Sequence, residues 1–261
     1  MIKKESYTTE DLLAIIRRLR EPDGCPWDKV QTHESIKKDM IEECYEAIDA
    51  LDKGDDHAFA NELGDVLLQV AFHSVLADER GAFTYDDVVN EICTKLISRH
   101  THVFGSDHAG NVDEAYTTWE TNKKKEKGLD SYTAMLKDVP GYLPALMRAA
   151  KVQKKAAGVG FDWDAAAPVL EKLTEETDEL REAMSEADAD KIEEEYGDLL
   201  FSVVNLGRKL SLTPEISMNK ATDKFIARFE KMESIAKERG LDMINMTADE
   251  LEELWTAVKK A

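Results

Sequence analysis

The stretches EECYE at 42–46 and ELGD at 62–65 decide the fold of this chain, because their acidic pattern occurs a second time. The second copy reads EETDE at 175–179 and EYGD at 195–198. All five acidic positions recur at an interval of 133 residues, without a gap between the two acidic segments. We interpret the chain as an internal duplication.

Apolar residues recur at helical spacing through both copies, and no alternating strand pattern stands out. We expect the apolar stripes of the two acidic helices in the first copy to face a core. These stripes consist of Ile36, Met40, Cys44, Ile48 and Leu51, followed by Leu63, Val66, Leu67 and Val70. The acidic residues lie beside the stripes, and a short turn at 52–56 joins the helices. We also expect Trp27 and Trp163, at helix starts, in the core.

The predicted fold class is therefore all-α, with two tandem domains and almost no sheet. The N-terminal domain is predicted at 1–122 and the C-terminal domain at 145–261. The segment 123–144 contains KKKEKG and two prolines, which favour an interdomain linker.

The composition limits the partners of this protein. Its 261 residues carry 54 acidic and 34 basic side chains, a net charge of −20, which argues against strong nucleic-acid binding. The N-terminal residues lack the apolar core of a signal peptide, and the apolar stretch 66–77 is too short to span a membrane. The three cysteines form no CxxC motif. We expect a cytoplasmic protein without membrane contact.

Each copy places two carboxylates at i,i+3 on one helix and two on the next, which predicts an oxygen-lined cage for a hard divalent cation. The candidate ligands are Glu43, Glu46, Glu62 and Asp65 in the first copy and Glu176, Glu179, Glu195 and Asp198 in the second. Di-iron bundles use Glu-x-x-His, and no histidine here has an acid three residues before it. The predicted cofactor is therefore magnesium, with manganese as the substitute.

Basic residues accompany the acids, most completely in the second copy. Candidates are Lys172, Lys191, Lys224, Arg228 and Lys259, the last on one face with Trp255, and in the first copy Lys95 and Arg99. Metal-binding carboxylates together with cations for non-bridging oxygens are what phosphoryl-type transfer requires. Helical Lys and Arg also form ordinary surface ion pairs, and Trp255 also suits packing.

Taken together, these motifs resemble the MazG family of the all-α NTP pyrophosphatase superfamily. They are tandem EExxE…ExxD helices, each followed by KxxxR and WxxxK, with CPWDKVQT at 25–32. The resemblance implies magnesium-dependent hydrolysis of nucleoside triphosphates of broad base specificity to monophosphate and pyrophosphate. It also implies four-helix-bundle cores formed or completed by dimerisation, hence a homodimer.

The resemblance assigns roles to residues of the second copy. Glu176, Glu179, Glu195 and Asp198 match the metal ligands, and Glu175 would position or deprotonate the attacking water. The positions that contact phosphates or nucleotide match Lys172, Lys191, Lys224, Arg228, Trp255 and Lys259.

The two copies differ in these cations. Asp39 and Ala58 stand in the first copy where the second has Lys172 and Lys191. We predict that the C-terminal copy carries most of the activity, which fits a family that includes members with a silent N-terminal copy.

Two alternatives are open at this point. One is a house-cleaning nucleotide hydrolase of narrow specificity. The other is a non-enzymatic helical adaptor whose acidic faces bind partner proteins.

Overall fold

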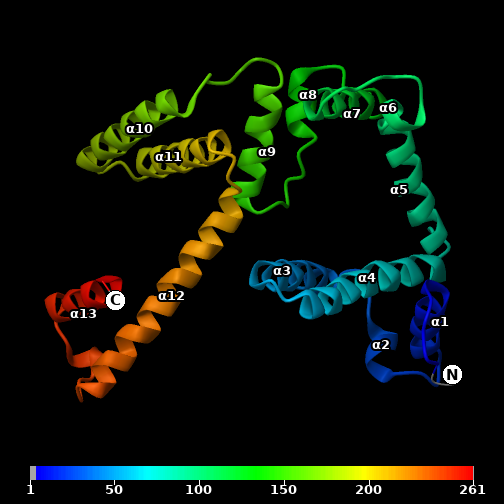
Figure 1. The fold of residues 1–261 in the computed structure, drawn as a ribbon, viewed down its shortest axis with the longest axis horizontal. Helices are drawn as coiled ribbons and strands as arrows, with labels where there is room; N and C mark the ends of the chain where they lie inside the picture. The colour runs from blue at the N-terminus through cyan, green and yellow to red at the C-terminus, as the bar shows by residue number, and fades with distance from the viewer. Residues whose placement is uncertain (1–3, 261) are drawn as a thin grey trace. The chain divides into compact units, whose positions relative to one another are not determined.

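The computed structural model describes residues 4–260 (Figure 1). Every regular element within these residues is a helix, which confirms the all-α prediction. The chain divides into two compact units between Glu126 and Lys127, a point inside the segment 123–144.

The N-terminal unit is built around a helical hairpin. Its helices are α1 (Thr9–Arg20), α2 (Pro26–Val30), α3 (Lys37–Lys53), α4 (Asp56–Glu79), α5 (Tyr85–Arg99), α6 (Thr101–Phe104) and α7 (Val112–Glu126). Gly54 ends α3 in the left-handed conformation with φ of 71°, which suits glycine. The side chain of Asp55 then caps α4 by accepting bonds from two backbone amides. This tight turn packs α3 against α4.

The buried core of this unit lies where α1 packs on the C-terminal half of α4. It consists of Leu13, Ile16, Ile36, Ala71, Phe72, Val75 and Leu76. The expected core stripe therefore holds for Ile36 but is wrong for several residues nearer the acids. Ile48 is 40% exposed, Leu51 56% and Leu63 48%. Periodicity identified an apolar face, but no element between residues 4 and 260 buries these three side chains.

The two tryptophans expected in the core are also exposed. Trp27 is 60% accessible and Trp163 37%. Trp27 lies in the first turn of α2, and Trp163 precedes the helix that begins at Ala166. Neither belongs to a core cluster among residues 4–260.

The C-terminal unit contains a second hairpin. Its helices are α8 (Tyr132–Lys137), α9 (Ala145–Ala157), α10 (Ala166–Glu186), α11 (Ala189–Lys209), α12 (Pro214–Glu238), the 3₁₀ helix η1 (Met243–Asn245) and α13 (Ala248–Lys260). Ala187 turns the chain with φ of 56°, and Asp188 caps α11. Helix α9 packs on α11 and α12. Helix α13 folds back along the C-terminal part of α12, burying Met232, Ala236, Leu254 and Val258 (Figure 1).

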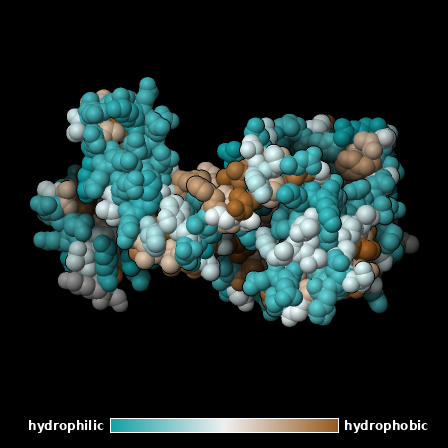
Figure 2. Space-filling view, turned by 90° about the horizontal axis from the view of Figure 1, so that it is seen from above, coloured by the Kyte–Doolittle hydropathy of each residue, from teal (hydrophilic) through white to brown (hydrophobic). Residues whose placement is uncertain are grey.

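Polar residues dominate the visible surface, with apolar patches between them (Figure 2). Between residues 4 and 260, no helix has the length and apolar character that crossing a bilayer requires.

Candidate metal and nucleotide site

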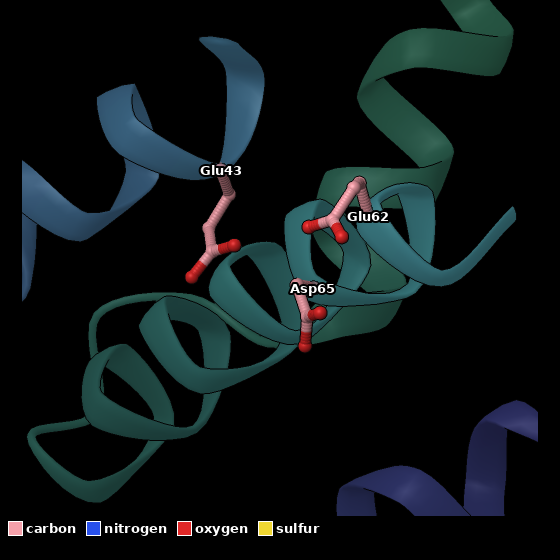
Figure 3. A group of neighbouring side chains, drawn as sticks. All are labelled: Glu43, Glu62 and Asp65. Carbon is pink, nitrogen blue, oxygen red and sulfur yellow. The ribbon is translucent and has the colours of Figure 1, made fainter. Parts of the chain in front are cut away.

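The hairpin of the N-terminal unit brings three carboxylates together. Glu43 projects from α3 toward Glu62 and Asp65 on α4 (Figure 3). One carboxylate oxygen from each lies within 4.8 Å of the others, and all three side chains are half-buried. Glu46, the fourth expected ligand, is exposed and is not a member of this group.

The hairpin of the C-terminal unit also brings three carboxylates together. Glu176 and Glu179 of α10 meet Glu195 of α11, again with ligand oxygens within 4.8 Å of one another. Glu176 is buried, with 5% of its surface accessible. Asp198 is exposed and is not a member of this group. We call the two groups the N-terminal and the C-terminal triad. The donor set of each, three carboxylates from two consecutive helices, fits a hard divalent cation.

Burial, and after it mutual repulsion, raises the pKa of one acid in each triad. Burial raises the pKa of Glu43, and the negative charges of Asp65, Glu46 and Glu62 raise it further. Desolvation likewise raises the pKa of Glu179, an effect partly offset by the positive charge of Lys172. A carboxylate beside other carboxylates is harder to ionise, and a divalent cation at the centre relieves that repulsion.

Lys172 lies among the acids of the C-terminal triad. Its Nζ donates to Oε1 of Glu175 and to Oε1 of Glu176, both at 2.9 Å, and lies 4.0 Å from Oε2 of Glu179. These bonds, first to Glu176 and then to Glu175, raise the pKa of Lys172 far above its ordinary value. The Glu175 side chain is 58% exposed, so water reaches its carboxylate.

The other expected cations of the C-terminal unit lie elsewhere. Lys191 Nζ pairs with Oε2 of Glu186 at 2.6 Å, near the hairpin turn. Lys224 and Arg228 lie on α12. On α13, Lys259 Nζ lies 5.3 Å from the ring centroid of Trp255, and that ring is 5.1 Å from Phe225 of α12. Phe225 of α12 thus forms a second group with Trp255 and Lys259 of α13, and this group is both aromatic and cationic.

The N-terminal unit has a counterpart to this second group. The ring centroid of Trp119 lies 5.5 Å from the guanidinium carbon of Arg99 and 4.6 Å from the ammonium nitrogen of Lys123. Arg99 also donates to both carboxylate oxygens of Glu126 at 2.9 and 3.0 Å. Lys95 pairs with Glu91 at 3.3 Å. Both expected cations of this unit are therefore held by acids.

Asn61, a residue that the sequence pattern did not single out, lies beside the N-terminal triad. Asn61 Nδ2 lies 3.4 Å from Oε1 of Glu62 and 3.5 Å from Oδ2 of Asp65. Its position four residues before Asp65 was the available signal, since i,i+4 side chains meet on a helix.

The matches to known proteins agree with this duplicated site. A family model described as the MazG nucleotide pyrophosphohydrolase domain matches residues 31–104 and 166–234, and these two segments contain both triads. The chain belongs to the MazG family. Its tandem arrangement corresponds to two copies of the MazG domain.

Among MazG relatives, the chain is 46% identical to the nucleoside triphosphate pyrophosphohydrolase/pyrophosphatase MazG of Thermotoga maritima, over 99% of this chain and 98% of that protein. It is 44% identical to the nucleoside triphosphate pyrophosphohydrolase of Escherichia coli K12, over 95% and 96% of the two chains. It also matches half of the longer, uncharacterized protein YabN of Bacillus subtilis at 44% identity. Because the matching family model and the T. maritima and E. coli relatives are all named as pyrophosphohydrolases, the chain is an enzyme, and the adaptor alternative is wrong.

Proposed function

We propose that this MazG protein hydrolyses nucleoside triphosphates of several bases to nucleoside monophosphate and pyrophosphate, with magnesium, in the cytoplasm. The observation that carries the proposal is the C-terminal triad, in which the buried Glu176, the half-buried Glu195 and the exposed Glu179 converge beside Lys172. Acids that can hold a divalent ion, next to a cation for phosphate oxygens, suit the chemistry of a triphosphate.

In this proposal Glu176, Glu179 and Glu195 would hold magnesium, and Asp198, one turn after Glu195, would complete the ligand set. When bound, the ion neutralises phosphate charge and activates a coordinated water. Manganese would serve in its place, since it also accepts oxygen ligands.

Glu175 is the proposed general base. Its neighbour Glu176 is buried in the triad, whereas the Glu175 carboxylate remains accessible to water. Glu175 accepts the proton of the water that cleaves the bond between the α- and β-phosphates. Lys172, Lys191, Lys224 and Arg228 bind phosphate oxygens, and Trp255 stacks on the base beside Lys259.

A homodimer is part of this proposal. The acid-bearing helices keep large apolar side chains at the surface, among them Leu170 (53% exposed), Tyr196 (55%) and Phe201 (44%). Apolar surface of this kind beside a polar site is typical of an interface. A second copy would bury it and form a four-helix core with α10 and α11.

We propose that the N-terminal unit contributes little turnover. It keeps a triad, but Asp39 and Ala58 stand where the C-terminal unit has the cations Lys172 and Lys191. It is therefore poorly equipped to bind a triphosphate.

The test is incubation of the protein with magnesium and each canonical and modified nucleoside triphosphate, followed by chromatography. Monophosphate with pyrophosphate supports the proposal. Diphosphate with free phosphate contradicts it, and turnover of a single modified nucleotide would contradict the broad base range.

A further inference from the structure

The two triads differ in the side chain that lies one helical turn before them. In α10 this residue is Lys172, and the equivalent position of α3 is Asp39. Lys172 Nζ is within 2.9 Å of oxygens from both Glu175 and Glu176. Asp39 instead adds negative charge and pairs with Lys38 at 3.5 Å. Within the part of the chain that the structure describes, the C-terminal triad therefore contains a cation and the N-terminal triad does not.

The N-terminal triad has a neutral side chain beside it, Asn61 of α4. Its acids Glu62 and Asp65 are approached by the amide of Asn61, at 3.4 and 3.5 Å. The ion pairs found within residues 4–260 include none to Glu43, Glu62 or Asp65. A divalent ion at this group therefore competes with no lysine or arginine of residues 4–260 for the three carboxylates.

In the C-terminal triad, a divalent ion has to compete with Lys172. An oxygen that accepts a charge-assisted hydrogen bond at 2.9 Å must give up that bond, or share it, to coordinate a metal. The ammonium also lowers the attraction of the site for a second cation. The lysine stem is flexible, however, and its point charge binds phosphate as readily as carboxylate.

We propose that Lys172 is an internal counter-cation of the C-terminal triad. When nucleotide phosphates bind its ammonium group, the carboxylates are free to coordinate a metal. The C-terminal triad then takes up metal and nucleotide together, whereas the N-terminal triad takes up metal alone. This inference rests on the proposed function, since it requires a divalent ion and a phosphate at the same site.

The test uses the full chain, Mn²⁺ as the probe and calorimetry or electron paramagnetic resonance as the readout, without nucleotide. A Glu43→Gln background disables the N-terminal triad, so that the C-terminal triad alone reports. Lys172→Met is expected to tighten Mn²⁺ binding at least about fivefold, the size of a typical coupling between two ligands. Lys172→Arg keeps the charge and should stay near the background protein.

A matched control comes from the same helix. Arg181 pairs with Asp178 at 2.6 Å, on the exposed side of α10. Arg181→Met removes one positive charge as Lys172→Met does, but away from the triad. Its Mn²⁺ affinity should stay within about twofold of the background, because exposed ion pairs act weakly.

A reciprocal variant tests the same idea in the other unit. Asp39→Lys, in a Glu176→Gln background, introduces a tethered ammonium before the N-terminal triad. Mn²⁺ binding there should weaken by a factor similar to the gain in Lys172→Met. This measurement stands even where Lys172→Met fails to fold.

The outcomes separate the inference from the function on which it rests. Unchanged or weaker Mn²⁺ binding by folded Lys172→Met overturns the counter-cation role and leaves the proposed function standing. If that variant does not fold, unchanged binding by Asp39→Lys overturns it instead. Absence of Mn²⁺ binding by the wild-type protein, even with a nonhydrolysable triphosphate, overturns the proposed function itself.

Discussion

Asp162 accepts a hydrogen bond from Arg208 Nη1 at 3.0 Å, which joins the segment before α10 to the last turn of α11. Lys209 Nζ donates to the same carboxylate at 2.6 Å. The bond from Arg208, followed by that from Lys209, lowers the pKa of Asp162 to about 2. Since α10 and α11 carry the C-terminal triad between them, this carboxylate holds the open end of the hairpin that positions the site.

Replacing Asp162 by Asn should lower the stability of the C-terminal unit by about 1 kcal/mol, a value reduced for solvent screening. The amide cannot form the charge-assisted bonds, and Arg208 and Lys209 lose their anion. Urea unfolding with hydrogen exchange on α10 amides measures the effect. Asp164→Asn, at an exposed acid two residues later, is the control; an equal loss there would contradict the role of Asp162.

The same contact predicts a dependence on acid pH. Because the folded pKa of Asp162 lies below the ordinary value of 3.8, its contribution is present above about pH 4. It is lost as the pH falls from there through the folded pKa of about 2. The stability difference between wild type and Asp162→Asn should therefore shrink between pH 4 and pH 2. A difference that stays constant over this range would refute the assignment.

A histidine pair in the N-terminal unit predicts a second pH effect. His33 Nδ1 lies 2.8 Å from His73 Nδ1, and the two rings stack. Burial, and secondarily the charge of His33, lowers the pKa of His73 below its ordinary value of 6.5. A histidine whose folded pKa is depressed favours folding at neutral pH, and the unfolded state gains protons first on acidification.

We therefore expect the N-terminal unit to lose stability as the pH falls below about 6.5. His73→Gln should reduce this loss, whereas His108→Gln, at an exposed position, should not. Hydrogen exchange of α4 amides at pH 7.5 and 5.5 measures the loss of stability in each protein. Equal pH dependence in wild type and His73→Gln would exclude the pair as its source.

The aromatic and cationic group of α12–α13 predicts a binding defect. Arg228→Met should raise KM for the triphosphate by about tenfold to a hundredfold, because it removes a phosphate contact worth roughly 1.5–3 kcal/mol. Mn²⁺ binding without nucleotide should not change. Lys237→Met, an exposed lysine later on α12, serves as control. A normal KM in Arg228→Met would remove Arg228 from the site.

The sequence predicted the helices and their acids well, because these depend on local spacing. The i,i+3 acids of 42–46 and 62–65, joined by a turn at 52–56, fall on α3 and α4 as expected, and the second copy falls on α10 and α11. Two amphipathic helices that are joined by a short turn pack against each other as antiparallel neighbours.

What covers an apolar face could not be predicted in the same way. Ile48 and Ile36 share one stripe, yet Ile36 is buried by α1 and α4 while Ile48 is 40% exposed. Periodicity marks the face but not its partner. Long-range polar contacts were also missed, since neither His33–His73 nor Asp162–Arg208 has a local spacing that would reveal it.

The most direct test of the central claim compares one carboxylate from each triad. Glu176→Gln and Glu43→Gln make the same neutral replacement in α10 and α3, and each variant is assayed with magnesium and a nucleoside triphosphate for monophosphate and pyrophosphate. We predict that Glu176→Gln abolishes turnover and that Glu43→Gln retains most of it. Retained turnover in Glu176→Gln, with loss in Glu43→Gln, would contradict the assignment of the reaction to the C-terminal triad.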